Sequence, residues 1–281
     1  MTEFFELIAN MLNFTFMQRA LIVGGLVSLC AALLGVNLVL KRYAMIGTAL
    51  GNVGFAILTI AGIIEFVDFA PMAISFPLII LTAFIMLRIN NKSKARGDSA
   101  VAIVSTSSIA IGVIVAGLTT GITLHICSVL FGDMFLLQSW DIPLSIVLSI
   151  AVVGMFVFFY KQLFAITHDE NFARATGTKV EIYKSLLAIL TAVTIVMGMR
   201  LMGTMLIAAL TIFPALSAMQ LFKRFLSVVI ASAIIGVVCF FIGMLISMGQ
   251  DLPPGACVVG VNLIVYVIVS GIKFVRRRVG V

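Results

Sequence analysis

Long apolar runs separated by short polar segments dominate the chain. The runs hold no Asp, Glu, Lys or Arg, and they cover residues 20–40, 46–64, 69–87, 99–118, 142–160, 185–199, 201–222, 225–249 and 252–272. Most of them are close to the roughly 20 residues that a helix needs to cross the hydrocarbon of a bilayer. The pattern therefore predicts an all-α, polytopic transmembrane helical bundle with eight or nine spans, nine being the better count.

Composition supports a membrane domain and excludes a soluble one. Of the 281 residues, 62% are apolar and 10% are charged, whereas a soluble domain carries roughly 25% charged residues. We expect a single transmembrane domain over residues 19–281. Residues 1–18 contain two acids and no Lys or Arg, and their apolar residues are spaced as in an amphipathic helix. This segment is expected to lie on the membrane surface and not to be a cleaved signal peptide.

The distribution of basic residues predicts the orientation of the chain. With the N-terminus outside, the connections facing the cytoplasm hold most of the Lys and Arg residues, and only Arg19 and Arg200 fall outside. This asymmetry follows the positive-inside rule and predicts a multi-pass protein of the bacterial inner membrane. It also accounts for the net charge of +7 without a nucleic-acid partner, because the cations lie in separate loops that face anionic lipid.

Enzymatic motifs are missing from the sequence. It has no Walker glycine loop, no HExxH pair and no Ser/His/Asp set on neighbouring spans. Its two histidines, His125 and His168, are expected on opposite sides of the membrane. The four cysteines form no CxxC pair, and three of them lie in apolar runs, where packing is their ordinary role. If ATP drives this protein, another subunit must bind it.

One polar connection, residues 161–184, is long enough to do more than join two spans. The stretch from Asp169 to Thr176 can form a short helix, with Thr167 or Asp169 as its N-cap and Gly177 as its stop. A short amphipathic helix at the cytoplasmic face has the shape needed to dock on a partner protein. An ordinary solvated loop is the other interpretation of the same residues.

Polar residues inside a span are the first place to look for a transport path. Thr48 and Asn52, in the run 46–64, are four residues apart and share one helical face. Gly47 and Gly51 form a GxxxG pair that allows a neighbouring helix to come close. The polar stripe either lines a path or bonds to a neighbouring helix.

Four segments, in order, resemble the zinc/manganese permease family of ABC importers. They are residues 34–42 followed by 46–52, residues 168–177, residues 203–215 and residues 253–256. With the spacing of the spans, the likeness covers almost the whole chain, and the second and third segments are the specific ones. The resemblance implies a membrane-spanning permease subunit that imports a divalent transition metal ion, zinc or manganese. It also implies a homodimer with the substrate path at the subunit interface.

The resemblance further implies partners and roles. ATP would be bound by a separate cytoplasmic subunit, no cofactor would be covalently bound, and an extracytoplasmic binding protein would deliver the metal. The coupling helix, which fits a groove on the ATPase, would comprise Asp169, Glu170, Phe172, Ala173, Arg174 and Gly177.

The chain departs from the family at the expected metal site. The family usually carries an aspartate and, four residues later, a histidine at the positions held here by Thr48 and Asn52. These residues offer only weak oxygen coordination, which manganese accepts more readily than zinc. The metal could pass with weak binding, or ligands could come from the outer segment 121–141 through His125, Cys127 and Asp133. A third interpretation is a metal chelate or cofactor as substrate, or a passive chain in a heterodimer. A secondary carrier is disfavoured because no charge lies in any run.

Overall fold

The computed structural model describes residues 15–41, 44–63, 77–78, 81–82, 85, 97–118, 141–250 and 252–279. The regular structure of these residues is helical throughout, as the sequence predicts. The main helices are α2 (Thr15–Leu40), α3 (Ala44–Ile63), α5 (Gly97–Leu118), α7 (Asp141–Phe158), α8 (Tyr160–His168), α9 (Glu170–Ala175), α10 (Val180–Met202), α11 (Thr204–Leu221), α12 (Phe225–Gln250) and α13 (Pro254–Val279).

Six of the described helices are long and apolar enough to cross a membrane, and α7 with α8 makes a seventh if this bent pair is one span. Helix α3 contains a shorter apolar stretch, Met45–Ile57. The predicted span at residues 69–87 lies mostly outside the described residues. A multi-span helical bundle is therefore confirmed, whereas the count of eight or nine is not.

Helix α2 begins at Thr15, four residues before the boundary expected at residue 19. Met17 is already buried in the bundle, with 1% of its surface exposed. Apolar packing thus extends the first span into the segment expected to lie on the membrane surface. The rest of that segment, residues 1–14, lies outside the described residues.

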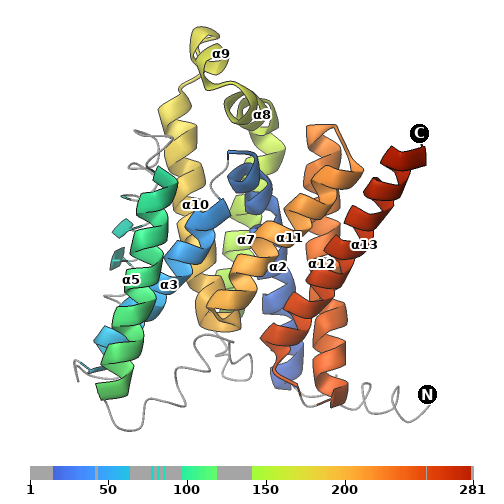
Figure 1. Ribbon diagram of the computed structural model, residues 1–281. Coiled ribbons are helices and arrows are strands. Elements are labelled where there is room, and N and C mark those ends of the chain that lie inside the picture. The colour runs from blue at the N-terminus through green and yellow to red at the C-terminus, as the bar shows by residue number, and fades with distance from the viewer. Residues whose placement is uncertain are drawn as a thin grey trace.

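The long helices run up and down between two ends of the bundle (Figure 1). The C-terminal ends of α2 and α13 lie on the same side as α8 and α9, and so does the turn between α11 and α12. We call this side the basic end, because Lys41 follows α2, Lys161 lies in α8, Lys223 lies between α11 and α12, and Lys273 lies near the end of α13. The positive-inside rule assigns such an end to the cytoplasm.

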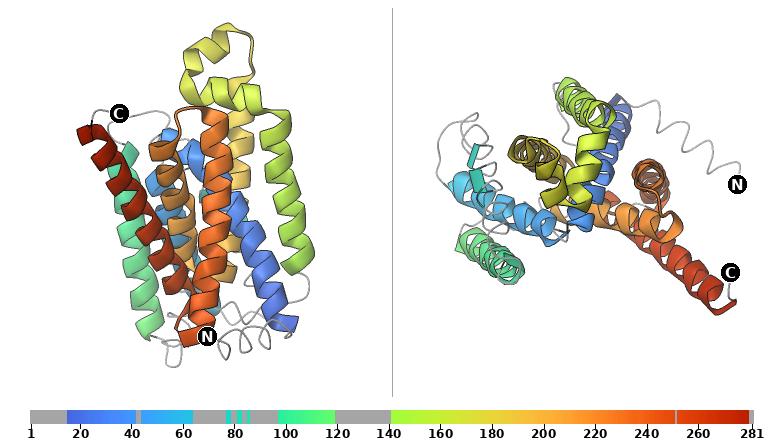
Figure 2. Two further views of the ribbon diagram at one scale, coloured as in Figure 1. Left: turned by 90° about the vertical axis from the view of Figure 1, so that its right-hand side faces the viewer. Right: turned by 90° about the horizontal axis from the view of Figure 1, so that it is seen from above.

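Helix α2 runs obliquely through the bundle (Figure 2). We call it the central helix, because it contacts α7, α10, α11 and α12. Small residues allow this close packing, because helices in lipid associate mainly through tight van der Waals contact. A Cβ atom added at Gly35 would collide with the backbone carbonyl oxygen of Thr211 in α11. The hydroxyl of Ser232 in α12 donates a hydrogen bond of 2.9 Å to the carbonyl oxygen of Ala32 in α2.

Helix α5 lies at the edge of the bundle and packs mainly on α3. Its outward face is apolar, and Ile103, Ile114 and Leu118 are 67%, 62% and 80% exposed. Such a face is unfavourable in water and is the ordinary surface of a helix that meets lipid. The same arrangement of an apolar exposed face is present on α13, where Ile264 and Val267 are exposed.

The contact between Gly35 and Thr211 yields a prediction on stability. Replacing Gly35 with alanine should lower the thermal unfolding midpoint of the detergent-solubilised protein, because overpacking against backbone costs about 1–3 kcal/mol. Gly260→Ala is the matched control, since a Cβ atom there has nothing within 4 Å. The packing account is wrong if both variants unfold at the same temperature.

Candidate functional site

Helix α8 lies across the basic end, at 76° to α7, and leads directly into α9. The Thr167 hydroxyl, near the end of α8, donates a hydrogen bond of 3.2 Å to the side-chain oxygen of Asn37 in α2. Asn37 is buried, with 4% of its surface exposed. The polar pair therefore fixes the end of α8 to the central helix.

Helix α9 has the capped form that the sequence predicts. The Asp169 carboxylate accepts hydrogen bonds from the backbone N–H groups of Asn171, at 2.9 Å, and Phe172, at 3.2 Å. Asp169 is thus the N-cap, whereas Thr167 bonds to α2 instead. The helix ends before Gly177, whose φ of +81° is a conformation that favours glycine.

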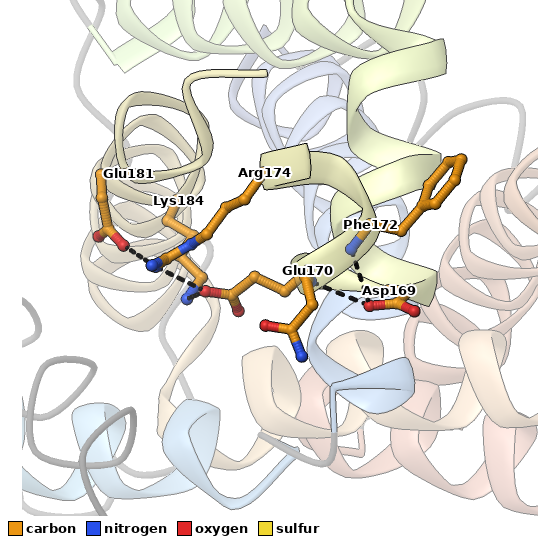
Figure 3. Close-up of polar contacts among 7 residues, drawn as sticks. Asp169, Glu170, Phe172, Arg174, Glu181 and Lys184 are labelled. Atoms are coloured by element: carbon orange, nitrogen blue, oxygen red, sulfur yellow. Dashed lines mark hydrogen bonds and ion pairs between the residues drawn. The ribbon is translucent and has the colours of Figure 1, made fainter. Parts of the chain in front are cut away.

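Glu170 joins α9 to α10 through an ionic cluster (Figure 3). Its carboxylate oxygen Oε1 lies 2.5 Å from Nζ of Lys184 in α10 and 3.1 Å from the guanidinium of Arg174. Arg174 also pairs with Glu181 of α10 at 2.5 Å. The Lys184 side chain is only 14% exposed, so its pair with Glu170 is stronger than the exposed Arg174–Glu181 pair. We call these four residues, with Lys41, the Glu170 cluster.

The charges of the cluster shift the pKa of the Glu170 carboxyl. Burial alone would raise this pKa, but the hydrogen bond from Lys184 and the charges of Lys184, Lys41 and Arg174 lower it below its usual range. The carboxylate therefore stays charged at neutral pH. The stability that its pairing contributes is lost only as the pH falls through this lowered pKa.

Lys41, directly after α2, belongs to the same cluster. Burial and, secondarily, the charge of Lys184 lower the pKa of its ammonium group to about 8, while Glu170 and Glu181 oppose that shift. The end of the central helix is thereby coupled electrostatically to α9 and α10.

The two neighbouring residues Phe172 and Ala173 face in opposite directions. Phe172 is 62% exposed, whereas Ala173 is fully buried and packs with Ile166 and Val180. Ala173, expected among the docking residues, thus anchors α9 to its own chain. Because of this contact, only Phe172 of the two leaves an apolar side chain exposed at the surface of the chain.

Thr48 and Asn52, the polar stripe of α3, each form a hydrogen bond in the structure. Asn52 donates a hydrogen bond of 2.8 Å to the Ser105 hydroxyl of α5, and the Thr48 hydroxyl donates one of 2.9 Å to the Met45 carbonyl oxygen. The glycine pair on the neighbouring face meets α11, with the Cβ positions of Gly47 and Gly51 each 3.3 Å from a threonine atom. The glycines allow close helix packing as predicted.

Among the described residues, no cluster of charged or thiol ligands lies around this stripe. In the described part of the chain, no group of three or more His, Cys, Asp or Glu residues could hold a metal ion. His125, Cys127 and Asp133 lie outside the described residues. Thr48 and Asn52 therefore stay predictions as residues of the path, with neutral oxygen atoms as their only ligands for a metal.

The sequence did not predict that the Glu170 cluster links α9 to α10 and α2. One signal was available, because Glu170 and Arg174 are four residues apart and such pairs meet on a helix. Lys184 is 14 positions from Glu170 and in another helix, and Lys41 lies in a different part of the chain, so only the fold brings them to Glu170.

Comparison with known proteins gives the chain a family. The model of the ABC 3 transport family matches residues 13–273. The manganese import system permease protein ScaB of Streptococcus gordonii is 28% identical over 98% of this chain and 99% of its own length. A protein of Haemophilus influenzae named "Probable iron transport system membrane protein" is 31% identical over 98% of this chain and 100% of its own. Among solved structures, PsaBC from Streptococcus pneumoniae in complex with Fab matches with a TM-score of 0.78 and 26% identity, over 94% of each chain.

The Glu170 cluster predicts how firmly α9 is held. Glu170→Gln should raise the hydrogen-exchange rate of the amides of α9 by roughly tenfold, because hydrogen bonds to charged groups contribute about 1.5–3 kcal/mol. Glu181→Gln is the matched control and should change exchange far less, since Glu181 is 74% exposed. Equal exchange rates in wild type and Glu170→Gln would show that the cluster does not hold α9.

Proposed function

The chain belongs to the ABC 3 transport family, and from that premise we propose that it is the membrane-spanning permease of an ATP-driven importer of divalent transition metals. It is a multi-pass protein of the bacterial cell membrane. The observation that carries the proposal is the match over nearly the full length of relatives named for manganese and iron transport. A capped helix presented at the basic end supports it further.

The proposed assembly has three kinds of partner. A cytoplasmic ATPase binds α9, an extracytoplasmic binding protein delivers the metal, and a second permease chain completes a homodimer. The exposed Phe172 ring supplies an apolar contact for the ATPase, and it points away from the Glu170–Arg174 pair on the other side of α9 (Figure 3). Aromatic side chains are enriched among the residues that carry most of the binding energy of an interface.

When the ATPase moves α9, the contacts at the basic end transmit this displacement to the membrane helices. Ala173 and the Glu170 cluster fix α9 to α10, and the Thr167–Asn37 hydrogen bond fixes α8 to α2. A displacement of α9 therefore moves α10 and the end of α2 with it, because packed elements transmit displacement and do not deform freely.

The path for the metal is proposed along the face of α3 that carries Thr48 and Asn52. Neutral oxygen ligands bind a divalent ion weakly, and weak binding suits a path that must release its cargo. Manganese accepts such ligands more readily than zinc does, and relatives named for manganese are among the matches. We therefore place manganese first among the substrates, before iron and zinc.

A second candidate is a permease for a metal chelate, or the passive half of a heterodimer. The observation in its favour is the lack of a ligand group for a bare ion among the described residues. A chelate carries its own ligands, and a passive chain leaves coordination to its partner. Both alternatives have the same fold and the same docking helix as the first proposal. Only a measurement of what is transported can distinguish them from it.

Uptake measurements test the proposed function. Vesicles holding this chain with its ATPase and binding protein should accumulate manganese when ATP is supplied, with zinc, iron and copper measured in parallel. Phe172→Ser should abolish uptake by removing the exposed ring, and the conservative Phe172→Leu should retain most of it. Size-exclusion profiles of both variants control for folding.

Two outcomes contradict this account. A folded complex that hydrolyses ATP and takes up none of the four metals overturns the import of bare ions and favours the second candidate. Normal uptake by Phe172→Ser overturns the docking role of Phe172 while leaving import intact.

A further inference from the structure

A cavity of about 520 Å³ opens at the basic end, between α8, the end of α2 and the turn from α11 to α12. The Glu170 cluster, Thr48 and Asn52 do not line it. The lining side chains are Leu40, Phe164, Thr167, His168, Met219, Phe222, Lys223, Phe225 and Val228. It is therefore separate from the proposed path and from the docking face of α9.

The lining is amphipathic. Its apolar part is built on aromatic rings, with Phe164 and Phe225 in contact at a centroid distance of 5.5 Å. Its polar part is cationic or neutral, since the described lining residues include Lys223, His168 and Thr167 but no Asp or Glu. In the part of the chain that the structure describes, Lys223 forms no ion pair. The cavity thus combines an apolar wall with a positive charge that pairs with no carboxylate among the described residues.

The position of the cavity identifies the environment it meets. Leu40 is the last residue of α2, and Phe225 is the first residue of α12. The cavity accordingly lies at the depth where the spans end, on the side that the positive-inside rule assigns to the cytoplasm. At this depth the cytoplasmic leaflet presents anionic head groups, and basic pockets between transmembrane helices there bind lipid phosphates.

We propose that this cavity binds an anionic phospholipid of the cytoplasmic leaflet. The lipid phosphate lies against Lys223 and His168, and an acyl chain packs along Phe164, Phe222 and Phe225. The proposal rests on the orientation of the chain in the membrane and is independent of which metal is carried.

The bound lipid has a structural consequence for α8. Three lining residues, Phe164, Thr167 and His168, belong to α8, which leads into α9. A lipid in the cavity would hold α8 against the turn between α11 and α12. The geometry of the docking helix then depends on the anionic lipid as well as on the Glu170 cluster.

Native mass spectrometry tests the proposal on the intact complex of permease and ATPase. The complex is extracted from bilayers of phosphatidylcholine alone or mixed with phosphatidylglycerol, and the retained lipid is counted. Wild type should retain phosphatidylglycerol in preference to phosphatidylcholine. Lys223→Gln should retain about fivefold less phosphatidylglycerol, the effect of about 1 kcal/mol per basic residue near an anionic surface.

The controls separate the charge at the cavity from general surface charge. Arg224→Gln removes the neighbouring exposed cation, which does not line the cavity, and should retain lipid as wild type does. Lys223→Arg keeps the charge and should also retain it. Both control variants change the same surface loop as Lys223→Gln. If they retain lipid, substitution in this loop does not by itself disrupt the cavity, and a loss in Lys223→Gln reflects the missing charge.

Three results would overturn the proposal. Equal retention by Lys223→Gln and Arg224→Gln would show that the cavity does not recognise the head group. Displacement of the lipid by excess inorganic phosphate would show a site for the free anion. Retention by the permease alone that disappears when the ATPase binds would show that the ATPase covers this cavity.

Discussion

The packing of small residues around α2 is the constraint on which the rest of the structure depends. Gly35 lets α11 come so close that an added methyl group would meet backbone, and Ser232 bonds α12 to the same helix. In lipid, where the hydrophobic effect does not drive helix association, such close contact is the main source of cohesion. Helix α3 then packs on α11 through its own glycine pair. The position of α2 therefore determines where its polar end, with Asn37 and Lys41, meets α8, α9 and α10.

At the basic end, a helix too short to be stable alone is held by its surroundings. Helix α9 has six residues, fewer than an isolated helix needs in water. Its N-cap, the buried Ala173 and the pairing of Glu170 with Lys184 hold it in place. With its inner face occupied by its own chain, α9 presents Phe172 outward. This arrangement gives the proposed ATPase contact a rigid connection to α10 and α2.

The sequence predicted what depends on local pattern and missed what depends on distant neighbours. Apolar runs predicted the helical spans, Thr167 or Asp169 was predicted as the start of α9, of which Asp169 is the N-cap, and Gly177 was predicted as its end. The inward direction of Ala173 was not predicted, because a six-residue helix shows too little periodicity to reveal which face is covered. The bond from Asn52 to Ser105 joins residues 53 positions apart, so Asn52 carried no local sign of its partner. The ion pair of Glu170 with Lys184 in the next long helix, and the influence of the Lys41 charge on Glu170, likewise depend on how the helices pack.

The central claim is that α9 and α10 move as one body when the ATPase changes state. Spin labels on Asn171→Cys in α9, Ile182→Cys in α10 and Val275→Cys in α13 measure this, since all three positions are exposed. In the complex with ATPase, the account predicts that the 171–182 distance stays constant between the nucleotide-free and ATP-bound states, while the 171–275 distance changes. A changed 171–182 distance together with an unchanged 182–275 distance would contradict it, because α9 would then move without carrying the membrane helices.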